Sequence, residues 1–164
     1  MKKLSMLLIC IPFLITGCDK GIFDFGRAGY ISWEGKKYPL HKGYMNDTGS
    51  KIFMISSDLE FSFSENQHYT GTGNLVQVFG IDTNQDGTTK DGSYDLTLLT
   101  GGVGVNYNFE TDDYDYVTDF DTIISGTLEI TRDGDDYEIN IEFRDEEENV
   151  VRANFKGELA KNTD

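Results

Sequence analysis

Residues 124–159 read ISGTLEITRDGDDYEINIEFRDEEENVVRANFKGEL, and this stretch is the clearest indication of the fold class. Apolar side chains recur at about every second position in three successive runs, 124–132, 136–144 and 149–159, and the residues between them are largely polar. A period of two places alternate side chains on opposite faces of a β-strand. The short links between the runs, Asp133-Gly134 and the acidic segment 145–149, are typical of hairpin turns. The stretch therefore predicts three consecutive strands, each with one buried and one solvated face.

The rest of the chain shows the same period between closely spaced turn signals. Two more alternating sets are Val103, Val105, Tyr107 and Phe109, and Tyr114, Tyr116, Thr118 and Phe120. Further strands are predicted at 29–34, 37–44, 51–57, 59–64, 75–81 and 93–99, and the apolar run 75–81 is typical of a central strand. The glycine-rich residues 101–104 are interpreted as a turn or bulge. Because short turns join strands that pair mostly antiparallel, we predict an all-β, single-domain antiparallel β-sandwich, with a calycin-like β-barrel as the alternative.

The N-terminus carries a pattern of another kind. Lys2 and Lys3 precede an apolar run that ends in Ile15-Thr16-Gly17-Cys18. A positive start, a short apolar run and small residues before a cleavage point are typical of a secretory signal peptide, and the run is too short to span a bilayer. The four residues Ile15-Thr16-Gly17-Cys18 resemble the lipobox of bacterial lipoproteins. That resemblance implies that Cys18 carries a lipid such as palmitate and becomes the N-terminus after cleavage.

The predicted organisation is therefore a signal peptide at 1–17, a lipidated tether at 18–27 and a β-domain at 28–164. The alternative is an ordinary signal peptide with an incidental cysteine. The lipid on Cys18 would attach the protein to the inner or outer membrane of the cell envelope, with the domain outside the cytoplasm. Because Cys10 lies in the removed segment, the mature chain could form no internal disulfide.

A second resemblance concerns the last forty residues. Ser125-Gly126-Thr127-Leu128 and Phe155-Lys156-Gly157-Glu158-Leu159 are similar to the ends of small uncharacterised β-rich lipoproteins of gut commensal bacteria. The resemblance implies a β-sandwich or a calycin-like barrel and brings no active-site motif with it.

The charge of the chain restricts its partners. The formal net charge is −15, and removal of Lys2 and Lys3 would make it −17. Nucleic-acid binders carry basic patches, so we expect no nucleic-acid partner. The chain also lacks a nucleophile elbow, a phosphate-binding loop and a dinucleotide fingerprint, and we expect no enzymatic activity.

One segment matches the first half of a calcium-binding loop. Asp82, Asn84 and Asp86 stand at positions 1, 3 and 5, Gly87 stands at position 6, and Thr88 follows at position 7. Position 12, where a bidentate glutamate belongs, is Ser93, and position 9 is Lys90, although Asp91 could substitute as a ligand. The candidate calcium ligands are therefore Asp82, Asn84, Asp86, Thr88 and Asp91. The alternative is a turn in which these residue types serve loop geometry.

Other candidates for binding are aromatic or acidic. Trp33, the single tryptophan, could be a sugar-binding platform, but it shares a predicted strand face with Ile31, which favours packing in the core. The acidic segment 112–121 is either a cation or basic-peptide site or an exposed charged face. His41 and His68 are far apart and are interpreted as surface or loop residues.

Two hypotheses of function remain from the sequence. In the first, the domain is a non-enzymatic binding module of the cell envelope with a glycan, cation or protein partner. In the second, it is a calycin-like carrier of a small apolar ligand. A filled core with an exposed aromatic patch favours the first, whereas a closed apolar cavity favours the second.

Overall fold

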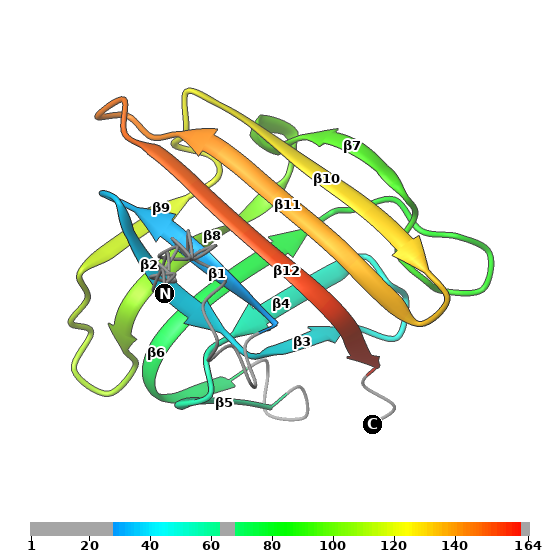
Figure 1. Ribbon diagram of the computed structural model, residues 1–164, viewed down its shortest axis with the longest axis horizontal. Helices are drawn as coiled ribbons and strands as arrows, with labels where there is room; N and C mark the ends of the chain where they lie inside the picture. The colour runs from blue at the N-terminus through cyan, green and yellow to red at the C-terminus, as the bar shows by residue number, and fades with distance from the viewer. Residues whose placement is uncertain (1–27, 63–67, 162–164) are drawn as a thin grey trace, which may run out of the picture.

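The computed structural model describes residues 28–62 and 68–161, and nearly all of them belong to one curled β-sheet or its turns (Figure 1). No α-helix occurs in these two ranges, and their only helical element is the 3₁₀ turn η1 (Leu96–Leu98). Within the same ranges, no helix is long and apolar enough to cross a membrane. The strands are β1 (Gly29–Trp33), β2 (Lys36–Leu40), β3 (Lys42–Met45), β4 (Lys51–Ile55), β5 (Leu59–Ser62), β6 (His68–Phe79), β7 (Gly92–Asp95), β8 (Thr100–Asn108), β9 (Tyr116–Asp119), β10 (Ser125–Asp133), β11 (Asp136–Arg144) and β12 (Val150–Lys161).

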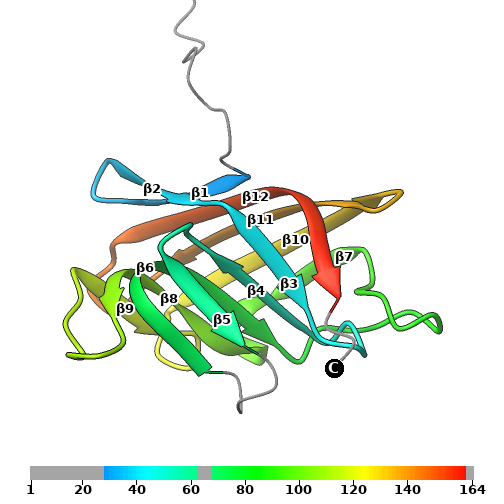
Figure 2. The same cartoon turned by 90° about the horizontal axis from the view of Figure 1, so that it is seen from below.

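The predicted all-β class is confirmed, and the sheet folds over on itself as a half-barrel. Its strand order is β7-β10-β11-β12-β3-β4-β6-β8-β9, with β1 and β2 beside β12 and β5 beside β6. The first half of β12 pairs with β1 and its last residues pair with β3, so this strand belongs to both layers (Figure 2). The β12–β3 pairing is parallel, whereas the other named strand pairs are antiparallel. The sheet is therefore mixed, and its pairing is mostly antiparallel, as predicted, with this one parallel pair as the exception.

The C-terminal meander has the predicted form. β10, β11 and β12 pair in order and antiparallel, and burial along β11 alternates strictly, with Tyr137, Ile139, Ile141 and Phe143 buried. The predicted central strand is also confirmed, because β6 pairs with β4 on one side and β8 on the other. Two predicted strands differ from the observed elements. The segment 93–99 ends in η1, and 37–44 divides into β2 and β3 around His41.

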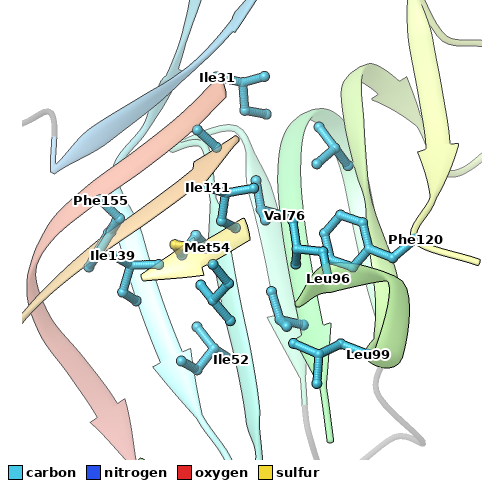
Figure 3. Close-up of a cluster of buried hydrophobic side chains, with 14 of the residues drawn as sticks. Ile31, Ile52, Met54, Val76, Leu96, Leu99, Phe120, Ile139, Ile141 and Phe155 are labelled. Carbon is cyan, nitrogen blue, oxygen red and sulfur yellow. The ribbon is translucent and has the colours of Figure 1, made fainter. Parts of the chain in front are cut away.

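The main core fills the space between the two layers (Figure 3). Ile139 and Ile141 of the meander face Met54 of β4 and Val76 of β6, and Phe120 packs edge-on against Phe143 at a centroid distance of 5.8 Å. The buried members of this cluster are at most 9% exposed, and their close packing gives the two layers one shared interior.

A bulge in β8 overturns one predicted alternation. Val103 and Val105 face the main core, but Tyr107 and Phe109 lie in a second cluster on the opposite face of the sheet. The register between β8 and β6 shifts at Gly73/Leu75, and Asn106 has a φ of 49°. An extra residue in the left-handed conformation breaks the period of two and redirects the side chains that follow. The prediction that all four side chains share one face is therefore wrong.

The bulge is stabilised by a buried side chain. Asn74, which is 4% exposed, accepts a hydrogen bond at Oδ1 from the backbone N–H of Asn106 at 3.0 Å. Its Nδ2 donates to the carbonyl of Pro39 at 3.1 Å, and its own N–H donates to Ser56 Oγ at 3.0 Å. One amide thus links β6, β8 and β2, and it gives the out-of-ladder N–H of Asn106 a partner.

Candidate functional site

A groove runs over β8 on the outer face of the sheet, which is the face turned away from the main core. Gln77 of β6 pairs with Gly102 of β8, which in turn pairs with Asp119 of β9. The next row on the same face is Leu75, Gly104 and Val117. Because glycine has no side chain, β8 forms a low floor between the side chains of β6 and β9. The resulting hollow, the outer groove, has a volume of about 260 Å³.

Aromatic rings form one end of the outer groove. Tyr69 and Phe109 stack with centroids 4.8 Å apart and an interplanar angle of 21°, and Phe109 also contacts Tyr107 at 4.6 Å. Tyr107 in turn stacks on Tyr114 at 5.7 Å and 13°. Tyr114 is 52% exposed, so this row of rings runs from the second cluster to solvent. Flat, partly exposed rings bind the apolar faces of cyclic ligands while their polar edges stay solvated.

Polar groups face the rings across the glycine floor. The Gln77 Oε1 accepts a hydrogen bond from the Tyr69 hydroxyl at 3.2 Å, and its Nε2 donates to no atom of the described residues. Asp119 is exposed at the far side of the floor. Burial raises the pKa of Tyr69, so its hydroxyl stays a neutral donor. The groove thus combines an aromatic surface with an amide donor and a carboxylate acceptor, a donor and acceptor set suited to hydroxyl-rich ligands.

The acidic segment 112–121 supports the wall of the groove. The hydroxyl of Tyr107 donates a hydrogen bond to Asp112, which raises the pKa of Tyr107. Asp115 Oδ2 accepts from Asn106 Nδ2 at 2.7 Å, at the bulge itself. Two of the carboxylates are therefore hydrogen-bonded to the residues that shape the site.

The candidate calcium loop forms a hydrogen-bonded turn near the C-terminal end of β10, where Arg132 contacts it. Asp86 Oδ1 accepts from the N–H and the hydroxyl of Thr88 at 3.0 and 2.6 Å, which lowers the pKa of Asp86. Asn84 Nδ2 donates to Thr88 Oγ1 at 3.1 Å, and Arg132 donates to the same hydroxyl at 3.1 Å.

The loop therefore already has its own hydrogen bonds, and a cation of the protein, Arg132, stands 3.7 Å from Asp86 Oδ2. Asp82 and Asp91 are both exposed. Among residues 28–62 and 68–161, no group of three or more His, Cys, Asp or Glu side chains is arranged to hold a metal ion. Calcium binding by Asp82, Asn84, Asp86, Thr88 and Asp91 stays a prediction.

The remaining candidates have different surroundings. Trp33 is half-buried, packs against the main core and stacks on Tyr116 with centroids 4.8 Å apart. His68 is exposed at the start of β6, whereas His41 is half-buried and accepts a hydrogen bond at Nδ1 from the N–H of Ser57. Cys18 and the segments 1–17 and 18–27 lie outside the described residues.

Sequence reasoning missed the floor of the outer groove. Gly102 and Gly104 are interior residues of β8, not part of the predicted turn. The signal that could have found them is glycine at alternate positions of a strand, because it leaves one face without side chains. Comparison with protein-family models, curated proteins and solved structures finds no match to this chain.

Proposed function

We propose that this domain is a non-enzymatic binding module that holds a neutral oligosaccharide in the outer groove. The observation that carries this proposal is the glycine floor of Gly102 and Gly104 between an aromatic end and the polar pair Gln77 and Asp119. A sugar ring has apolar C–H faces and a hydroxyl rim. The rings of Tyr107 and Phe109 can pack against the C–H faces, and the Gln77 amide and Asp119 carboxylate can form hydrogen bonds with the hydroxyl groups. The net charge of −15 disfavours anionic sugars.

The filled interior favours this function over the carrier of a small apolar ligand. Buried aliphatic and aromatic side chains of both layers pack against each other in the main core. The outer groove, by contrast, is open to solvent and lies on the far side of β4, β6 and β8. A carrier needs an apolar cavity that encloses its ligand, whereas a surface module needs only a shaped patch.

The test is binding to an array of neutral oligosaccharides, followed by calorimetric titration of the best binder with two variants. Asp119→Ala is expected to weaken affinity about tenfold, because a charged hydrogen-bond acceptor is lost, and to leave stability nearly unchanged at this exposed position. Tyr107→Ala is expected to weaken the affinity for the oligosaccharide by a similar factor, because the contact between the tyrosine ring and the sugar is lost.

The matched control is Tyr30→Ala, which removes a half-buried tyrosine of β1 outside the groove. The Tyr30→Ala variant should bind the oligosaccharide with the same affinity as the wild type. The proposal fails if no oligosaccharide of the array binds at millimolar concentration, or if Asp119→Ala and Tyr30→Ala behave alike.

We also propose that a lipid on Cys18 attaches the domain to a membrane of the cell envelope. Support comes from the sequence Ile15-Thr16-Gly17-Cys18 behind a short apolar run. The β-domain begins at residue 28, so the short segment 18–27 would join the lipidated cysteine to it.

Replacing Cys18 with serine is expected to move the protein from the membrane fraction to the soluble fraction, because serine has no thiol for acylation. Incorporation of labelled fatty acid should fall to background in the same variant. Fractionation and metabolic labelling in a bacterial host measure both effects. Full retention of Cys18→Ser in washed membranes contradicts the anchor.

A further inference from the structure

A second hollow of about 480 Å³ adjoins the outer groove at β9, and Val117, Thr118 and Asp119 line both. We call it the aromatic cleft, because Trp33, Tyr114 and Tyr116 line it. Three separate parts of the chain meet here: the end of β1, the strand β9 with the turn before it, and the turn between β11 and β12. Its volume lies within the range of about 300 to 1,000 Å³ that holds small-molecule ligands.

The aromatic side of the cleft is firmly positioned. Trp33 stacks on Tyr116 at 4.8 Å and 27°, and Tyr38 packs against Trp33 at 6.4 Å. The Tyr116 hydroxyl donates to Asp145 Oδ2 at 2.9 Å, which joins β9 to the β11–β12 turn. The indole Nε1 of Trp33 is buried and has no hydrogen-bond partner among the described residues.

The charge of the cleft is uniformly negative. Asp115, Asp119, Glu146 and Glu147 are exposed carboxylates that line it, and none of its described lining residues is Lys, Arg or His. The fifth carboxylate, Asp145, is buried. Burial raises its pKa, but hydrogen bonds from Asn149, Tyr116 and Glu147 together lower it, so Asp145 stays ionised.

We propose that the aromatic cleft binds a small organic ammonium ion, in the manner of an alkylammonium or quaternary ammonium group. Aromatic rings attract such a cation through their negative faces and pack against its methyl or methylene groups. The surrounding carboxylates supply the opposite charge, while the hydrated inorganic cations gain nothing from the rings. The ligand class therefore follows from the joint presence of rings and carboxylates in one cavity. The aromatic cleft shares Val117, Thr118 and Asp119 with the outer groove, but Trp33, Tyr116 and the carboxylates of the β11–β12 turn line the cleft alone, so the two proposals are tested with different variants.

Trp33 provides a local readout, because it is the only tryptophan of the chain. The experiment titrates the whole chain with choline and follows tryptophan fluorescence at constant ionic strength, with sodium chloride as the balancing salt. The neutral isostere 3,3-dimethylbutan-1-ol has the same shape without the charge. We expect saturable quenching or a spectral shift with choline, and at least about tenfold weaker binding of the isostere. Equal binding of the two compounds, or no saturable change with choline, overturns the proposal.

A pair of double variants separates a local charge effect from general screening. Glu146→Gln with Glu147→Gln removes two carboxylates of the cleft and is expected to weaken choline binding about fivefold. Asp133→Asn with Asp135→Asn removes two exposed carboxylates at the opposite end of β11 and is expected to leave binding unchanged. If both pairs weaken binding equally, the attraction comes from the net charge of the protein and the proposed site is wrong.

Discussion

Replacing Ile141 with alanine is expected to lower the free energy of unfolding by about 2 to 5 kcal/mol. Ile141 is 3% exposed at the centre of β11 and faces the strands of the opposite layer in the main core (Figure 3). Removal of its side chain leaves a cavity between two layers that share one interior, and the paired strands on both sides of β11 restrict its collapse. Urea denaturation followed by circular dichroism measures the difference.

The neighbouring residue gives the matched control. Asn140 lies on the solvated face of the same strand, and Asn140→Ala is expected to change stability by no more than about 0.5 kcal/mol. Comparable losses in the two variants would contradict the assignment of faces in β11.

The meander could be predicted from its sequence because nothing in it disturbs the period of two. Each of β10, β11 and β12 presents one face to solvent, so its polar positions are visible as clearly as its apolar ones. The period of two therefore predicts both the strand conformation and which side chains are buried. The parallel pairing of β12 with β3 could not be predicted, because it depends on the curl of the sheet and joins residues far apart in the chain.

The outer groove was hidden for a different reason. Its aromatic residues Tyr107 and Phe109 continue the alternation of Val103 and Val105 in the sequence, so they read as part of the same buried face. The extra residue at Asn106 reverses that assignment, and the amide that holds it comes from Asn74 on another strand. Local periodicity does not detect a bulge whose support is tertiary. Acidic residues such as Asp112 and Asp119 were visible, but their position beside the rings was not.

The bulge connects fold and function in one testable residue. Asn74→Ala is expected to lower the free energy of unfolding by about 2 to 4 kcal/mol, because the N–H of Asn106 and the carbonyl of Pro39 each lose a partner. If Asn106 leaves the left-handed conformation, Tyr107 and Phe109 no longer face the groove. Affinity for an oligosaccharide identified on the array should therefore fall together with stability.

Comparison with Ile141→Ala makes this prediction specific. Both variants lose several kcal/mol of stability by the arguments above, but Ile141 lies in the main core, on the other side of the sheet from the outer groove. At a temperature where each variant is still folded, Ile141→Ala should bind the oligosaccharide as the wild type does, whereas Asn74→Ala should bind it at least about tenfold more weakly. Calorimetric titration of both variants decides between the two outcomes. Equal affinities would mean that the bulge stabilises the domain without orienting the rings, and the groove would then owe its shape to the glycines of β8 alone.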